Sequence, residues 1–130
     1  MPEQSPSAPG AQRVLVVDDN QDAANSLAVL LKVLGHDVMT AFDGPSALEL
    51  VPLFKPRLVL LDLAMPGMDG FAVAHALRTR AGGKELVIVA LTGFGQSDFL
   101  RATREAGFDT HLVKPTSAAA VSKLIAAQLH

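Results

Sequence analysis

The chain contains no cysteine, tryptophan or tyrosine, and these absences exclude several classes of protein. Without cysteine, the chain can form neither a disulfide framework nor a thiolate metal site, which fits a reducing compartment. The six phenylalanines are scattered, so no row of aromatic side chains is available for stacking on bases. A disulfide-stabilised secreted domain and a surface for single-stranded nucleic acid are therefore both disfavoured.

Long apolar runs and an excess of positive charge are also missing. No apolar run reaches the roughly 20 residues that a membrane-spanning helix needs, so we expect no membrane insertion. Residues 1–12 lack the charged and apolar regions of a signal peptide. The net charge is −2 and no basic stripe is present, so we expect no direct binding to nucleic acid. We accordingly expect a cytoplasmic protein.

The chain does have enough apolar sequence for one folded domain. Of its 130 residues, 49% are hydrophobic, which is sufficient for a core without disulfides. The first twelve residues are different, because they hold three Pro, two Ser, two Gln and a Gly. We expect a flexible leader or linker over residues 1–12 and a single domain over 13–130.

Beyond the leader, short apolar runs alternate with longer segments of helical periodicity. Strands are expected over residues 14–17, 37–40, 58–61, 86–91 and 109–113. Helices are expected over 22–34, around 47–51, after an N-cap at Asp69, over 97–106 and over 117–129. Either Pro52 or Pro56 would limit the second helix. Repeated βα units predict one doubly wound α/β domain with a parallel sheet and helices on both faces.

Polar residues stand at the ends of four of these strands. Asp18 and Asp19 follow the first, Asp62 the third, Thr92 the fourth and Lys114 the fifth. The carboxyl ends of parallel strands share one edge of the sheet, where ligands bind in such folds. Clustered carboxylates repel each other unless a hard cation such as Mg²⁺ joins them. With a hydroxyl and an ammonium group nearby, the Asp62 carboxylate is suited to accept a phosphoryl group as a nucleophile.

Each of these residues also has a plainer interpretation. Asp18 and Asp19 could cap the first helix, and Asp62 could be an ordinary loop carboxylate. Thr92 could merely end a strand, and Lys114 could cover apolar surface with its stem. Because all five side chains suit one chemistry and are predicted to lie at one edge, their combination favours the metal-assisted site.

Four motifs carry a family resemblance. They read VLVVDDN at 14–20, LLDLAMPGMDG at 60–70, ALTG at 90–93 and LVKP at 112–115. In this order and spacing they resemble a response-regulator receiver domain of the chemotaxis-regulator type, from about residue 13 to the C-terminus. The resemblance implies a flavodoxin-like (βα)5 fold with strand order 2-1-3-4-5. The segments 92–96 and 106–115 are also similar to receivers of hybrid histidine kinases.

The resemblance implies a phosphoacceptor in a two-component phosphorelay. Asp62 would take a phosphoryl group from a phosphohistidine of a partner histidine kinase or histidine phosphotransfer protein. Mg²⁺, for which Mn²⁺ is an expected substitute, would be held by Asp18, Asp19, Asp62 and the backbone carbonyl of Ala64. The domain would be a signalling module, not an enzyme, and would catalyse only its own phosphorylation and slow autodephosphorylation.

Further implied roles concern the switch. Thr92 and Lys114 would contact the phosphoryl group, and the peptide bond between Lys114 and Pro115 would be cis. Thr92 would act as a switch together with residue 111, which is His111 here. The family also allows a phosphorylation-dependent dimer through the last helices.

The chain departs from the family pattern in two respects. The family usually has Tyr or Phe three residues before the lysine, and His111 stands there, where its charge state could add pH sensitivity. Ala64 and Phe94 occupy positions that influence attack of water on the phosphoryl group, and both are apolar. Slow self-dephosphorylation is therefore expected.

Two other functions compete with the phosphoacceptor. The first is a pseudo-receiver that serves as a constitutive docking module, for which His111 is the one hint. The second is an Mg²⁺-dependent phosphatase that forms an aspartyl-phosphate. Such enzymes usually place two aspartates at alternate positions after the first strand, whereas the nucleophile here would follow the third.

Overall fold

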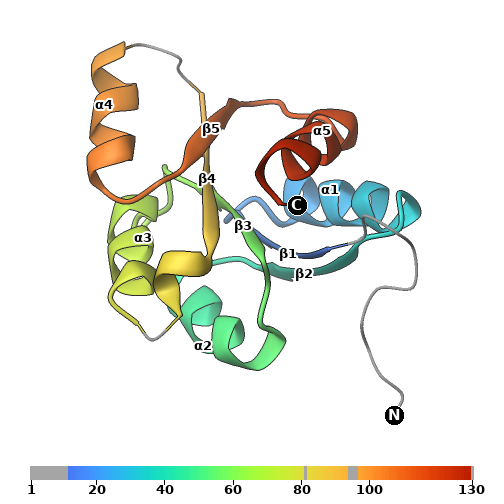
Figure 1. The fold of residues 1–130 in the computed structure, drawn as a ribbon, viewed down its shortest axis with the longest axis horizontal. Coiled ribbons are helices and arrows are strands. Elements are labelled where there is room, and N and C mark those ends of the chain that lie inside the picture. The colour runs from blue at the N-terminus through green and yellow to red at the C-terminus, as the bar shows by residue number, and fades with distance from the viewer. Residues whose placement is uncertain (1–11, 81, 94–96, 130) are drawn as a thin grey trace.

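The computed structural model describes residues 12–80, 82–93 and 97–129 (Figure 1). The strands are β1 Arg13–Val17, β2 Asp37–Ala41, β3 Leu58–Asp62, β4 Val87–Thr92 and β5 Thr110–Val113. The helices are α1 Gln21–Val33, α2 Gly44–Phe54, α3 Gly70–Arg78, α4 Ser97–Glu105 and α5 Ala118–Gln128, with a short 3-10 helix, η1 Gly83–Glu85, before β4. The elements agree with the predicted ones to within about two residues at most ends, the uncertainty that is normal for element boundaries, and only η1 was not predicted.

The five strands form one parallel sheet in the order β2-β1-β3-β4-β5, as expected. The chain leaves β1 through α1 to β2 at one edge and then crosses back to β3, so the strand order changes direction beside β1. Ligand sites of open α/β sheets lie at the carboxyl ends of the strands at such a point. The topology therefore predicts a ligand site at the residues that follow β1 and β3.

Apolar side chains fill a core on each face of the sheet. In β1, Val14 and Val16 pack under α1 and α5, while Leu15 and Val17 face α2 and α3 (Figure 1). All four are at most 1% exposed. The two-sided burial explains why this strand is an unbroken apolar run and not an alternating one.

Helix α2 continues through a proline. Pro52 lies inside the helix, which ends at Phe54, and Lys55 then adopts a left-handed conformation with φ 56°. Pro52 has no N–H to donate to the carbonyl of Leu48 one turn earlier. Arg80 replaces that donor, because its Nη1 lies 2.7 Å from the Leu48 oxygen. The helix therefore ends before Pro56, not at Pro52.

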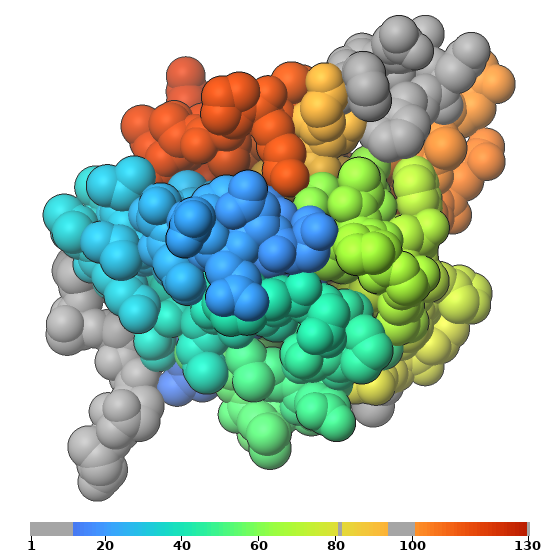
Figure 2. Space-filling view, turned by 180° about the vertical axis from the view of Figure 1, so that it is seen from behind, coloured from blue at the N-terminus to red at the C-terminus, as the bar shows by residue number. Residues whose placement is uncertain are grey.

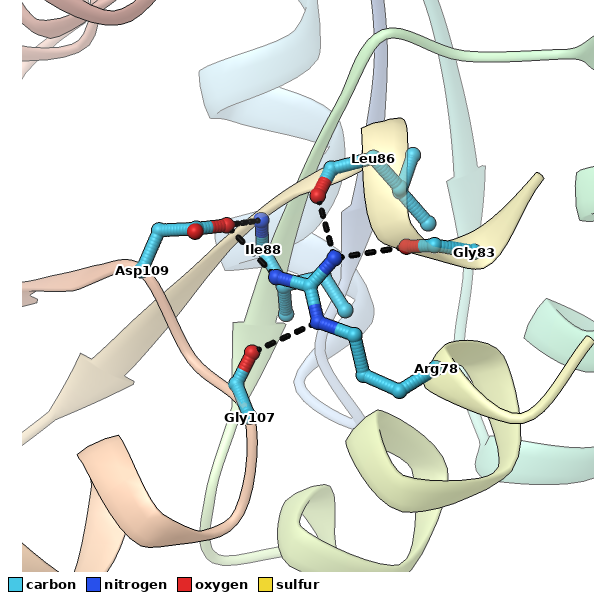
Figure 3. A network of polar contacts seen from close by, with 6 residues as sticks. All are labelled: Arg78, Gly83, Leu86, Ile88, Gly107 and Asp109. Atoms are coloured by element: carbon cyan, nitrogen blue, oxygen red, sulfur yellow. Dashed lines mark hydrogen bonds and ion pairs between the residues drawn. The ribbon is translucent and has the colours of Figure 1, made fainter.

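Arg78, at the end of α3, ties together the segments that precede β4 and β5 (Figure 3). Its guanidinium donates to the carbonyls of Gly83 and Leu86 at 2.6 and 2.5 Å, and to that of Gly107 at 2.8 Å. It also pairs with Asp109 at 2.6 Å, and the same Asp109 oxygen accepts the N–H of Ile88. This network aligns the amino ends of β4 and β5, and nothing in the sequence pattern indicated it.

Within the described residues, no helix is both long and apolar enough to cross a lipid bilayer. The expected leader lies, except for Gln12, outside the described residues.

Candidate functional site

The carboxyl ends of four strands meet at one edge of the molecule. Asp18 comes directly after β1, Asp62 and Thr92 are the last residues of β3 and β4, and Lys114 comes directly after β5. Figure 2 shows the segments that follow β1, β3 and β5 next to one another on this face. The N–H of Lys114 donates to the Thr92 carbonyl at 2.7 Å, which extends the β4–β5 pairing up to the site.

Three carboxylates gather at this edge. Asp18, Asp19 and Asp62 each offer one oxygen, and these oxygens all lie within 4.8 Å of one another. Asp18 and Asp62 are only 3% and 4% exposed, whereas Asp19 is exposed. The cluster is thus open to solvent on the side of Asp19 and closed by protein around Asp62.

Lys114 bridges the two buried carboxylates. Its Nζ lies 3.2 Å from an oxygen of Asp18 and 3.2 Å from an oxygen of Asp62. The other oxygen of each carboxylate accepts a backbone N–H, from Asn20 at 3.0 Å and from Ala64 at 3.1 Å. Each carboxylate is therefore oriented by Lys114, which follows β5, and by a backbone N–H two residues further along its own segment of the chain.

Burial and mutual repulsion shift the ionisation of the cluster. Burial, together with the smaller effect of the neighbouring Asp18, raises the pKa of Asp62 to about 6, against the opposing hydrogen bonds from Ala64 and Lys114. Burial alone would lower the pKa of Lys114, but its contacts with Asp18 and Asp62 outweigh burial, so that pKa is raised. At neutral pH, Lys114 is a cation between anions.

The donor set suits a hard divalent cation. Three carboxylates face one ammonium group, so two negative charges remain uncompensated in a partly closed site. Oxygen donors of this kind, with one side open to water, are what Mg²⁺ prefers. The residues present therefore fit the metal that the sequence suggested. The part expected of the Ala64 carbonyl stays a prediction.

Asn20, and not an aspartate, caps α1. Its side-chain oxygen accepts the N–H of Ala23 at 3.0 Å, and its own N–H donates to Asp18. Asp18 is thereby oriented toward the site and does not cap the helix. Sequence reasoning missed this role of Asn20, although Asn is among the strongest N-cap residues. The cap predicted at Asp69 for α3 is present, with Ala72 N–H at 2.9 Å.

Gly70 lets α3 approach the site closely. A Cβ at this position would lie 2.5 Å from the Asp62 carbonyl oxygen and 2.9 Å from the Cα of Leu63. Because both neighbours are backbone, neither can move aside without displacing the end of β3. Gly70 is a second positioning residue that the sequence reading missed.

A small cavity of about 200 Å³ adjoins the phosphoacceptor candidate. Asp62, Ala64, Phe71 and Thr92 contribute to its lining. The ring of Phe71 makes an edge-to-face contact with Phe108, at a centroid distance of 6.1 Å. The cavity thus lies between the candidate phosphoacceptor and an aromatic pair that reaches the segment before β5.

His111 lies in β5 opposite Ala90 of β4. Leu112 packs toward α1 and α5, so its neighbour His111 points to the other face, as the alternation of a strand requires. Thr92 and Ala90, two residues apart in β4, also share that face. The two expected switch residues therefore lie on one face, and His111 is half-buried there.

Two further predictions concern the Lys114–Pro115 peptide bond and Phe94. The peptide bond between Lys114 and Pro115 is cis, the isomer that the resemblance implies. Phe94, which was expected to influence dephosphorylation, lies outside the described residues.

The family model described as "Response regulator receiver domain" matches residues 14–126. The chain therefore belongs to the response-regulator receiver family, the signalling domains of two-component systems that interact with histidine kinases or phosphotransfer proteins.

Several known proteins are similar to this chain. The transcriptional regulatory protein PdtaR of Mycobacterium tuberculosis is 38% identical over 117 residues, which is 89% of this chain and 54% of that protein. The DNA-binding response regulator MtrA of Mycobacterium leprae is 39% identical over 104 residues, which is 80% of this chain and 45% of that protein. The chain spans about half the length of these relatives, and the expectation of no nucleic-acid binding stays untested.

The fold is that of solved receiver structures. The chemotaxis protein CheY4 of Vibrio cholerae superposes with a TM-score of 0.86 at 28% identity, over 92% of this chain and 99% of that one. The receiver domain of a histidine kinase from Syntrophus aciditrophicus has a TM-score of 0.80 over 92% of this chain and 90% of that one, and at 24% identity it shows the fold alone. The predicted flavodoxin-like fold is confirmed.

Proposed function

We propose that this domain, over residues 13–130, is a phosphoacceptor in which Asp62 takes a phosphoryl group from a phosphohistidine of a partner kinase or phosphotransfer protein. One observation supports this most directly. Asp62 is 4% exposed, and its carboxylate lies within 4.8 Å of two other carboxylates and is paired with Lys114. A buried carboxylate in such surroundings is an oriented nucleophile, not a solubilising surface charge.

The transfer is a single displacement at phosphorus. An oxygen of Asp62 forms the new P–O bond as the P–N bond to the imidazole of the donor breaks, and the imidazole leaves as a neutral ring after it takes up a proton. Bound at Asp18, Asp19 and Asp62, Mg²⁺ or Mn²⁺ would supply charge neutralisation for the phosphoryl oxygens. Lys114 provides a second positive charge at the same place, and Thr92 a hydroxyl donor.

The test is the direct detection of the adduct. We would incubate the protein with Mg²⁺ and either acetyl phosphate or phosphoramidate, whose P–N bond mimics phosphohistidine, and follow intact mass. One added phosphoryl group is expected with the metal and none in EDTA. Asp62→Asn should remain unmodified, while Asp69→Asn, which removes a carboxylate that caps α3 outside the cluster, should still accept the group.

The outcomes separate the alternatives. An adduct that survives in Asp62→Asn would move the acceptor to another residue. If wild-type protein gained no mass with either donor, the phosphoacceptor role would be wrong and a docking module would be favoured.

We expect the phosphorylated state to persist, because Ala64, which is exposed beside Asp62, has no side-chain group to orient an attacking water. The adduct should decay slowly after the donor is removed, and Ala64→Asn should speed its loss. A wild-type adduct lost within seconds in Mg²⁺ would contradict this expectation.

The response to phosphorylation would involve Thr92 and His111 and the face formed by α4, β5 and α5. Dimer formation through this face is one expected response, and Val113 of β5 is 46% exposed there. Sedimentation of the protein with and without acetyl phosphate measures it. A cytoplasmic location and the absence of direct nucleic-acid contact are part of the same proposal.

A further inference from the structure

A groove lies at the edge of the sheet opposite the carboxylates. It has a volume of about 460 Å³, and its lining residues come from the end of α2 with the residues that follow it, and from the end of α3 with the segment that leads to β4. These segments precede β3 and β4, so the groove is at the amino ends of the strands. Val51, Pro56, Leu77 and Leu86 contribute apolar walls. The volume is within the usual range of roughly 300–1,000 Å³ for small-molecule sites.

A guanidinium group is fixed at this groove. Arg80 lines it and donates through Nη1 to the carbonyl of Leu48, which Pro52 leaves without a helical donor. One hydrogen bond uses only one of the five N–H donors of the guanidinium. Among the described residues no carboxylate pairs with Arg80. The remaining donors of an anchored arginine are thus available to an anion.

A second cation stands on the same groove in an unusual backbone conformation. Lys55 has φ 56° and is the one non-glycine residue with positive φ in the described part of the chain. Glycine or asparagine is the usual residue where a helix ends in this way. A lysine here keeps an exposed ammonium group on the groove at the expense of local backbone strain.

The charge around the groove is mainly positive. Arg57 and Lys84 are exposed neighbours in the same two segments, and Glu85 is the one acidic lining residue. None of these side chains forms an ion pair among residues 12–80, 82–93 and 97–129. An apolar hollow with uncompensated cations complements a molecule that has an apolar body and an anionic group.

We propose that this groove is a binding site for a small amphiphilic organic anion, an aromatic or branched aliphatic carboxylate whose apolar body lies between α2 and η1 and whose carboxylate pairs with Arg80 and Lys55. The site is independent of Asp62 and of phosphorylation. The domain would thus have a second ligand-binding site, at the end of the sheet opposite the phosphoacceptor.

The test uses 1-naphthoate as the probe and 1-naphthalenemethanol as its neutral counterpart. Both are titrated to about 5 mM, a range that detects millimolar affinity, into ¹⁵N-labelled full-length chain. Naphthoate should shift the amides of 51–57 and 77–87 in a saturable way. The alcohol should shift the same amides but bind at least about fivefold more weakly, which is the effect expected for the loss of two partly exposed ion pairs.

Three variants locate the charge contacts. Arg80→Gln and Lys55→Gln should each weaken naphthoate binding about two- to threefold, while Glu85→Gln should strengthen it by a similar factor, as is typical of exposed ion pairs. Lys123→Gln, at an exposed lysine of α5, is the matched control and should leave the affinity unchanged. Because Glu85→Gln predicts a gain, a variant that merely loses stability cannot imitate the pattern.

Other results would overturn the proposal. Equal affinity for the acid and the alcohol would show that the cations do not recognise the anion. Shifts centred on the exposed apolar residues of α1, such as Leu30 and Val33, would place the probe elsewhere. The absence of saturable shifts would show that the groove binds no ligand of this class.

Discussion

Single residues decide how closely the elements approach the carboxylate cluster, and Gly70 is the clearest case. A Cβ there would meet the Asp62 carbonyl oxygen at 2.5 Å, whereas a Cβ at Gly93 would have open space. Gly70→Ala should therefore lower the free energy of unfolding by roughly 1–3 kcal/mol, as overpacking does.

Chemical denaturation of both alanine variants measures this difference. Gly93→Ala, the matched control, should stay within about 0.5 kcal/mol of wild type, as is usual away from strained or buried sites. We also expect Gly70→Ala to slow phosphoryl uptake, because relief of the clash displaces the end of β3. Equal stability of the two variants would contradict the close approach of α3.

His36 contacts residues near both ends of the domain, and its protonation makes stability depend on pH. Its Nδ1 accepts the N–H of Gln12 at 3.1 Å, and its Nε2 lies 3.3 Å from the hydroxyl of Ser122 in α5. Burial lowers its pKa from the ordinary value of 6.5. The neutral ring satisfies both contacts, whereas a proton on Nδ1 would displace the Gln12 donor.

Because the pKa of His36 is lower in the folded state, its contribution to stability is complete above pH 6.5 and is lost as the pH falls. The reason is that the unfolded chain binds the proton first. We expect the loss to stay within about 1 kcal/mol, the net value of one hydrogen bond. Thermal unfolding should be measured at about pH 8 and about pH 5, on either side of the ordinary His pKa. The decline in stability between them should be smaller in His36→Asn than in wild type. His75→Asn, at an exposed histidine of α3, should keep the full decline.

Among the secondary-structure elements, α2 depends on Arg80, a residue that follows α3. Pro52 removes the helical donor to Leu48, and Arg80 supplies another at 2.7 Å. In Pro52→Ala the backbone N–H at position 52 can donate to Leu48, so Arg80 is needed less. We expect Arg80→Met to cost about 1–2 kcal/mol in wild type and clearly less in the Pro52→Ala background.

A double-mutant cycle measures this coupling, which should be about 1 kcal/mol for residues in one network. Lys84→Met, at an exposed lysine of η1, serves as the control and should cost the same in both backgrounds. Additive effects of Pro52→Ala and Arg80→Met would show that the contact with Leu48 contributes nothing.

For the whole molecule, the cluster makes stability depend on a divalent cation. Asp62 is far along the chain from Asp18 and Asp19, so an ion bound by all three stabilises only the folded state. Mg²⁺ at 100 times its dissociation constant should add about 2.7 kcal/mol, and EDTA should remove that gain.

Thermal unfolding with increasing Mg²⁺ checks the prediction. Asp19→Asn should lose most of the stabilisation and, without metal, should be no less stable than wild type, since it removes one of three mutually repelling charges. Asp22→Asn, at an exposed acidic residue in the first turn of α1, should respond to Mg²⁺ as wild type does. A response to Mg²⁺ that is unchanged in Asp19→Asn would place the ion outside the cluster.

The fold class and the location of the site could be predicted from the sequence alone, because both depend on periodic or local signals. Apolar runs alternate with helical patterns, and parallel strands bring their carboxyl ends to one edge, so Asp18, Asp62 and Lys114 could be placed together before any contact was known. The cap at Asp69 is equally local, since its partner is three residues away. Periodic patterns and short-range sequence were sufficient for these predictions.

Contacts between residues far apart in the chain became evident only in the folded structure. Arg80 reaches Leu48 across 32 positions, and Arg78 reaches Asp109 across 31. No spacing rule predicts such pairs, because the distance between them is set by how helices pack on the sheet. The need for glycine at position 70 arises in the same way, from the close passage of α3 over the end of β3. Local patterns therefore specify where the carboxylates gather, and packing specifies how they are oriented and what lies at the opposite edge.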